Sequence, residues 1–183
     1  MTPSLGVQRR RFRNGALVYS LAYAVIVAAD HVTTLMLEGH GGTEANPLFR
    51  SGSGALSDSR ALVVFVLLWP VLVSLLHLSW RRAVGGARVP SALEQALIGA
   101  SPTAAALLPM VVLVSKSFIA FLNLLDVVTP LASLSRLRDV LAVLGVKDPS
   151  VAFYLSGVAV LVLALPLARM MARAWVLYLT RAS

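Results

Sequence analysis

The sequence has no cysteine among its 183 residues, and only 13% of those residues are charged. The absence of cysteine excludes disulfide bonds, thiolate catalysis and cysteine-ligated metal within this chain. Soluble domains are about a quarter charged, so the low charge predicts that lipid surrounds much of the chain. The hydrophobic fraction of 58% and the mean hydropathy of +0.82 favour the same class, a membrane protein.

Acidic residues are also scarce. Eight of them stand against sixteen lysines and arginines, which gives a net charge of +8. The basic residues lie at the ends of apolar runs and do not follow one surface. That placement is typical of the positive-inside signal and of contact with anionic headgroups. We therefore expect membrane lipid as a partner and expect no nucleic acid.

Four apolar runs are long enough to cross a bilayer, which takes roughly 20 residues. They predict spans at about residues 15–37, 61–79, 103–125 and 151–170. The expected fold class is all-α, a polytopic membrane bundle of four transmembrane helices. Residues 15–183 would form one transmembrane domain after a basic cytoplasmic tail at residues 1–14. The first run is longer than the apolar region of a signal peptide, so it predicts an uncleaved span.

The connections contain features of helices lying in the membrane interface. Ser91 and Glu94 have the spacing of a capping box, and the residues that follow present an apolar face. A second connection is expected to be helical at about residues 131–144. Within the second span, Pro70 is expected to kink the helix.

The distribution of basic residues predicts the orientation. Ten of them lie in the N-terminal tail, in the loop after the second span and at the C-terminal end, whereas the other two connections hold five. The bias predicts a multi-pass protein of the cell (cytoplasmic) membrane, of bacterial inner-membrane type, with both termini in the cytoplasm. Lys116, the sixteenth basic residue, falls inside the third span.

Polar residues within the spans are the candidate site. A charged side chain at membrane depth costs roughly 3 kcal/mol on insertion scales, so such groups usually face a bundle interior or a wet cavity. Asp30 lies near the end of the first span, and Lys116, Asn123 and Asp126 follow one another in the third. Lys116 is expected to pair with Asp30 or with Asp126. Such a pair can fix the register of two helices, or it can belong to a functional site.

A second group of polar residues follows the first span. Glu44 and Asn46 stand in the sequence Glu-Ala-Asn-Pro, where Pro47 restricts Asn46 to an extended conformation. The order Asp30, Thr34, glycine and Glu-Ala-Asn-Pro resembles a family of small prokaryotic membrane proteins of unknown function. The resemblance covers about twenty residues and implies that Asp30, Thr34, Glu44 and Asn46 are the marked positions. Members of that family often carry a lysine in the next span, whereas here Lys116 and Asn123 are in the third.

Another stretch is similar to the middle of the Yip-family membrane domain. It contains a basic end of a span, the Gly85-Gly86 pair, Ser91 and Leu108-Pro109. This resemblance implies a membrane-embedded protein with a role in trafficking or scaffolding.

These observations favour a non-enzymatic membrane component whose polar cluster locks the bundle or receives a partner, which would be a second copy or another membrane protein. One alternative is a subunit of a small-solute or ion transporter. Another is an intramembrane hydrolase in which the paired carboxylates of Asp30 and Asp126 divide acid and base roles. His31, Asp30, His40 and Glu44 offer metal-ligand atoms but lack the spacing of a metal motif, so no metal or other cofactor is expected.

Overall fold

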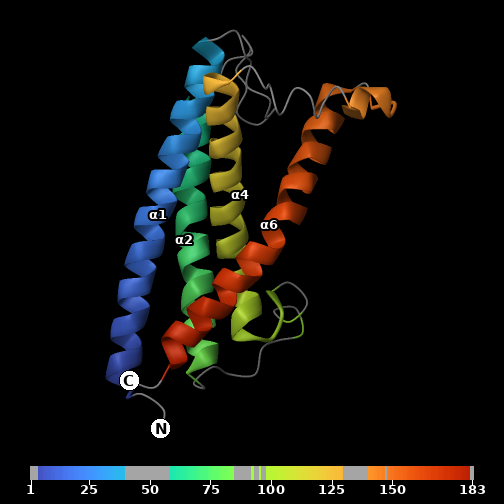
Figure 1. Cartoon of the computed structure of the whole chain (residues 1–183). Helices are drawn as coiled ribbons and strands as arrows, with labels where there is room; N and C mark the ends of the chain where they lie inside the picture. Colours follow the sequence, from blue (N-terminus) through green and yellow to red (C-terminus); the bar gives the residue numbers. More distant parts are fainter. Residues whose placement is uncertain are drawn as a thin grey trace. The chain divides into compact units, whose positions relative to one another are not determined.

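A computed structural model describes residues 4–39, 58–84, 92, 95, 98–129, 140–146 and 148–181. In this part of the chain the regular structure is entirely helical, without a strand (Figure 1). The prediction of an all-α helix bundle is confirmed.

The described residues include four long helices (Figure 1): α1 at Leu5–Gly39, α2 at Asp58–Ala83, α4 at Pro102–Val128 and α6 at Pro149–Thr180. Each contains a stretch that is long and apolar enough to cross a membrane, so the chain is a multi-pass membrane protein. Large apolar side chains such as Leu17, Val66, Phe121 and Leu163 are exposed on these helices. Lipid is the solvent that such surfaces require.

The helices extend beyond the predicted spans. α1 begins at Leu5, so the basic segment that the sequence assigns to a tail is helical and continuous with the first span. α6 continues to Thr180, past the predicted end at residue 170. Hydropathy detects the part of a helix inside the hydrocarbon, whereas a helix can continue into the headgroup region, where arginine side chains reach water.

Two helix starts share the same local chemistry. Ser101 Oγ accepts a hydrogen bond from the Ala104 N–H at 3.0 Å, and Asp148 Oδ1 accepts one from the Val151 N–H at 3.3 Å. Each of these N-cap residues precedes a proline at the first helical position, where a missing N–H has no cost. The pairs Ser-Pro and Asp-Pro therefore set where α4 and α6 begin.

Proline also occurs within the helices. Pro70 lies inside α2, Pro109 inside α4 and Pro166 inside α6, and each helix continues past its proline. In membrane bundles, neighbouring helices and local adjustments of the backbone satisfy the groups that a proline leaves without hydrogen bonds, so helices can contain prolines.

The predicted interfacial helices fall mainly outside the described residues. Ser91 and Glu94, the proposed capping box, are among the residues outside that range. Ala92, Gln95 and Ile98 are helical, and the Gly99 N–H donates to the Gln95 carbonyl at 2.9 Å with a φ of 75° at Gly99. A glycine with positive φ is the usual end of a helix. In the other connection, residues 140–143 form a helical turn that ends before Gly145.

The packing divides the chain into two compact units. The first unit contains residues 1–23, 68–114 and 165–183, and the second contains residues 24–67 and 115–164. The sequence predicts a single transmembrane domain, and each unit takes a segment from all four helices. The first unit holds the start of α1, the end of α2, the start of α4 and the end of α6.

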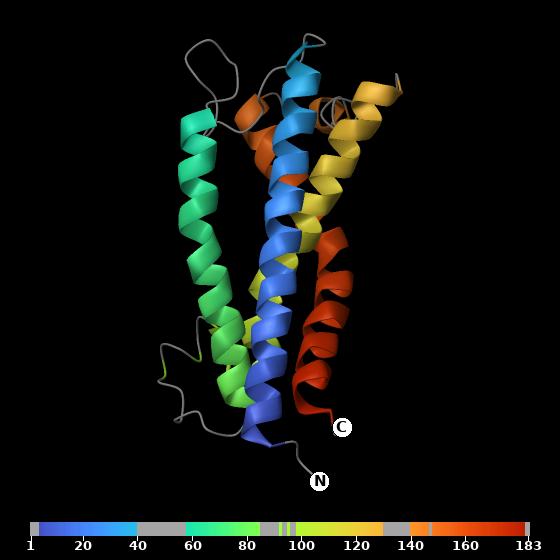
Figure 2. The ribbon, with the colours of Figure 1, turned by 90° about the vertical axis from the view of Figure 1, so that its left-hand side faces the viewer.

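The first unit packs around an aromatic cluster, which consists of Phe12, His77, Trp80 and Trp175. The Phe12 ring lies 5.2 Å from the Trp80 ring, 5.4 Å from the His77 ring and 6.3 Å from the Trp175 ring, measured between centroids. These residues come from α1, α2 and α6, whose ends lie together in this unit (Figure 2). The absence of a side chain at Gly15 lets the Trp175 ring approach the α1 backbone.

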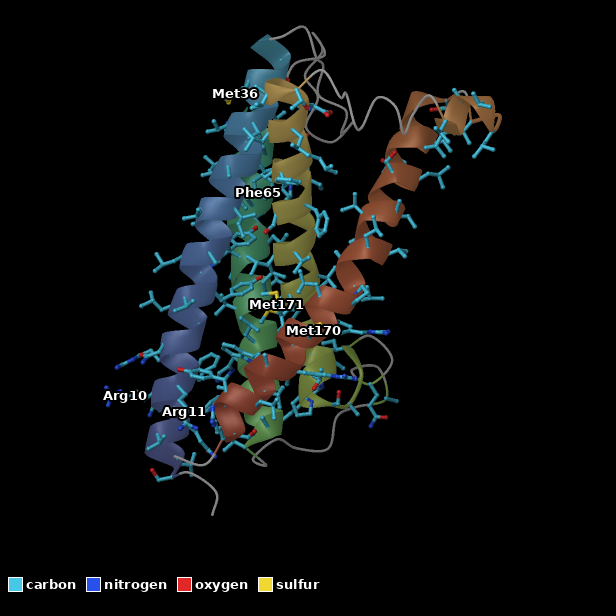
Figure 3. The ribbon with its side chains drawn as sticks, in the orientation of Figure 1. Arg10, Arg11, Met36, Phe65, Met170 and Met171 are labelled. Carbon is cyan, nitrogen blue, oxygen red and sulfur yellow. The ribbon has the colours of Figure 1, made fainter. Side chains whose placement is uncertain are left out.

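Polar contacts add to this packing. The Tyr19 hydroxyl donates to the Pro109 carbonyl at 3.1 Å in the buried interior of the first unit. Arg11, which is labelled in Figure 3, donates to the Tyr178 and Arg181 carbonyls at the end of α6. A guanidinium at this position satisfies carbonyls that a helix end leaves without partners.

Candidate functional site

The candidate site is a polar cluster in the second unit, formed by Asp30 and Thr34 of α1 with Lys116 and Asn123 of α4. Its centre is an ion pair in which Lys116 Nζ lies 2.6 Å from Asp30 Oδ2. The side chain of Asp30 is 10% exposed and that of Lys116 is 21% exposed. A short, charge-assisted hydrogen bond of this kind is among the stronger polar contacts in proteins. Of the two partners that the sequence offers Lys116, the structure pairs it with Asp30.

A third helix contributes an aromatic ring. Lys116 Nζ lies 4.7 Å from the centroid of Phe65, which belongs to α2 (Figure 3). An ammonium within about 6 Å of a ring centroid is attracted by the negative face of the ring. Lys116 therefore contacts α1 and α2 while its backbone belongs to α4. Phe65 is not among the site residues that the sequence predicts, because a phenylalanine within an apolar span has no distinguishing pattern.

A second polar contact lies further along the same two helices. Asn123 Nδ2 donates to Thr34 Oγ1 at 3.3 Å, and the Thr34 hydroxyl donates to the Asp30 carbonyl at 2.8 Å. Asn123 is buried. Thr33 donates to the Ala29 carbonyl at 2.9 Å, so both threonine hydroxyls bond a backbone carbonyl one turn earlier in α1.

The spacing of these residues explains why they meet. Asp30 and Thr34 are four residues apart, and Lys116 and Asn123 are seven apart, so each pair lies on one face of its helix. Asp30 contacts Lys116 and Thr34 contacts Asn123, so in this unit α1 and α4 run in the same direction. Two contacts in the same order fix both the rotation and the register of the two helices.

Asp126 occupies a different level. It lies ten residues after Lys116 in α4, which is about 15 Å along the helix axis. Asp126 is partly buried. Asp30 lies beside Lys116, so the same spacing separates Asp30 from Asp126. It disfavours a site that these two carboxylates share.

The remaining candidate residues are less informative. Glu44 and Asn46 lie outside the described residues, as does His40. Within the residues that the structure describes, no three histidine or acidic side chains converge as metal ligands would. The polar cluster offers one carboxylate, one hydroxyl and one amide as possible metal ligands. Its carboxylate, Asp30, is already bound to the ammonium of Lys116.

Comparisons with protein-family models, with curated proteins and with solved structures found no match to this chain.

Proposed function

We propose that the chain is a non-enzymatic component of the membrane, in which the polar cluster locks three helix segments of the second unit together. The observation that supports this proposal is the 2.6 Å contact between Lys116 and Asp30, made beside the Phe65 ring. A lysine that binds a carboxylate on one helix and a ring on another holds both against its own helix. A carboxylate bound in this way is a poor general base, which weighs against the hydrolase alternative.

The orientation is part of the proposal. In this proposal the chain lies in the cell membrane with both termini in the cytoplasm, and the polar cluster lies near the outer face. The concentration of arginines in the first unit supports this orientation. The resemblance to the family with Asp-x3-Thr and Glu-x-Asn-Pro would make Glu44 and Asn46, which lie outside the described residues, marked positions together with Asp30 and Thr34.

A double-mutant cycle tests the lock. Lys116→Met leaves a buried carboxylate without its partner, and Asp30→Asn leaves a partly buried ammonium without its partner. Removing one partner of a buried pair costs about 3–5 kcal/mol, whereas removing both is often close to neutral. In detergent micelles, each single variant should lose free energy of unfolding, and the double variant should recover most of that loss.

The control for the cycle pairs Asp30→Asn with Phe118→Leu, at a position that is 36% exposed on α4. This pair should be additive, since the two side chains have no shared polar contact to lose. Additive losses in the Asp30 and Lys116 cycle as well would contradict the lock. Unchanged stability in both single variants would point to the transporter alternative, in which the charges serve a solute.

A further inference from the structure

A concentration of arginines distinguishes the first unit. Its described residues include nine arginines and no acidic residue: Arg9, Arg10, Arg11, Arg13, Arg81, Arg82, Arg169, Arg173 and Arg181. Arg11 donates to carbonyls at the end of α6, and Arg82 donates to the Gly99 carbonyl at 2.7 Å. The other seven are exposed. Within its described residues, the first unit therefore has no carboxylate of its own to balance the arginines.

Buried donors in the aromatic cluster provide a second observation. Trp80 Nε1, Trp175 Nε1 and the Ser79 hydroxyl are buried and have no hydrogen-bond partner among the described residues. The third tryptophan differs, because Trp69 Nε1 donates to Ser20 Oγ at 3.0 Å. Trp175 is only 7% exposed and Ser79 is fully buried. A buried donor without an acceptor is uncommon in folded proteins and calls for an explanation.

The two observations lie in the same place. Trp80 and Trp175 both contact Phe12, and Arg11 and Arg13 are the residues on either side of Phe12 in α1. Arg81 and Arg82 follow Trp80 directly in α2. The donors without partners thus lie on the same helix ends as these arginines, and basic residues at the ends of membrane spans are expected to meet lipid headgroups.

The chemistry that satisfies both features is a phosphate diester. It supplies a negative charge for guanidinium groups and several oxygens that accept hydrogen bonds. Membranes present this group in anionic phospholipids, which attract basic segments at their surface. A zwitterionic lipid carries the same phosphate but adds a cation that the arginines repel.

We propose that the first unit binds the phosphate headgroup of an anionic phospholipid, which the exposed arginines attract and to which the indole N–H groups of Trp80 and Trp175 donate. Because these N–H groups are buried by their neighbours, binding requires the side chains around Phe12 to shift. Two of the three tryptophans of the chain therefore report on binding through their fluorescence.

The test is a titration of the full chain in micelles of a neutral detergent. A short-chain phosphatidylglycerol should change the tryptophan emission until saturation, and phosphatidylcholine with the same acyl chains should not. Replacing Arg81, Arg169 and Arg173 together by glutamine should raise the half-saturating concentration at least about tenfold, since each arginine near an anionic surface contributes about fivefold. The control is Arg60→Gln, an exposed arginine of the second unit. Because Arg60 lies outside the proposed site, its replacement should change the half-saturating concentration by well below the roughly fivefold expected for an arginine of the site.

Other results would overturn the proposal. They are an equal response to phosphatidylcholine, an equal response to glycerol phosphate at the same concentration, and an equal weakening by Arg60→Gln. A response to polyglutamate at lower concentrations than to phosphatidylglycerol would instead assign the surface to an acidic partner. If the triple variant does not fold, the single variant Arg169→Gln gives the same comparison.

Trp175→Phe keeps a ring and removes the donor, so it should reduce the increase in melting temperature that phosphatidylglycerol produces.

Discussion

Counted along the whole sequence, the first unit carries ten basic residues and one acidic residue, and the second carries six basic and seven acidic residues. The difference extends to the contacts inside each unit. In the first unit, rings from α2 and α6 pack around Phe12 of α1, and Arg11 and Arg82 donate to backbone carbonyls. In the second unit, an ion pair joins α1 to α4.

This comparison shows two ways of joining helices within lipid. Apolar side chains give little selectivity there, because lipid tails are as apolar as the side chains that face them. Close ring packing selects one arrangement by shape, as at Gly15 and Trp175. Paired charges select one helix arrangement because an unpaired charge within the membrane costs free energy, as it would for Asp30 or Lys116. The two units should therefore respond differently to small changes.

The largest expected effect among the following variants comes from Gly15→Ala in the first unit. A Cβ at Gly15 would lie 2.9 Å from Cη2 of the buried Trp175 ring and 3.4 Å from Cε1 of Tyr178. Overpacking costs about 1–3 kcal/mol, which exceeds the helical gain of about 1 kcal/mol from replacing glycine by alanine. Unfolding in micelles should show a net loss of stability.

The matched variant is Gly157→Ala in α6 of the second unit, where nothing lies within 4 Å of the added Cβ. This change should be neutral or should increase stability by up to about 1 kcal/mol. If both variants change the free energy of unfolding in the same direction, close packing around Trp175 does not distinguish the first unit from the second.

A smaller effect is expected from Tyr19→Phe. The change removes the hydroxyl that donates to the Pro109 carbonyl and keeps the ring. A hydrogen bond of this kind contributes about 0.5–1.5 kcal/mol, so the melting temperature should fall modestly. Tyr178→Phe, at an exposed ring of α6, should change the free energy of unfolding by less than about 0.5 kcal/mol. Equal effects would mean that the Tyr19 contact does not stabilise the unit.

The smallest effect is expected at the outer contact of the polar cluster. Thr34→Val and Asn123→Leu each remove one side of the hydrogen bond between α1 and α4. Such bonds between membrane helices average about 0.6 kcal/mol. A double-mutant cycle should give a coupling free energy near that value, well below the coupling of Asp30 with Lys116. The opposite ranking would place the lock at Asn123 and not at Lys116.

The sequence predicts the four spans because each apolar run is long and the connections are polar. It does not predict where the helices end. Ser101 and Asp148 cap α4 and α6 just before a proline, a local signal that the apolar pattern hides. At the end of α6, Arg169 and Arg173 interrupt the apolar run, although Ala168, Ala172 and Leu179 continue its buried face.

The site is predictable to a similar extent. Charged residues inside a span are rare, so Asp30 and Lys116 are conspicuous in the sequence, and opposite charges at one depth suggest a pair. The spacing within α4 already disfavours Asp126, which lies about 15 Å from Lys116 along the helix axis. The rotation of α4 that turns Lys116 toward Asp30 of α1 is not revealed by any pattern within one helix. The same is true of Phe65 and of the aromatic cluster, whose members come from different helices and have no common spacing.

The most direct test asks whether α1 and α4 meet through the polar cluster in a bilayer. The chain has no cysteine, so Thr34→Cys with Asn123→Cys introduces the only two thiols. A short bifunctional thiol reagent should bridge them, and mass spectrometry distinguishes one bridging molecule from two separate ones. The control combines Thr34→Cys with Phe121→Cys, at an exposed position of α4. The account predicts efficient bridging only from Asn123; equal or preferred bridging from Phe121 would contradict it.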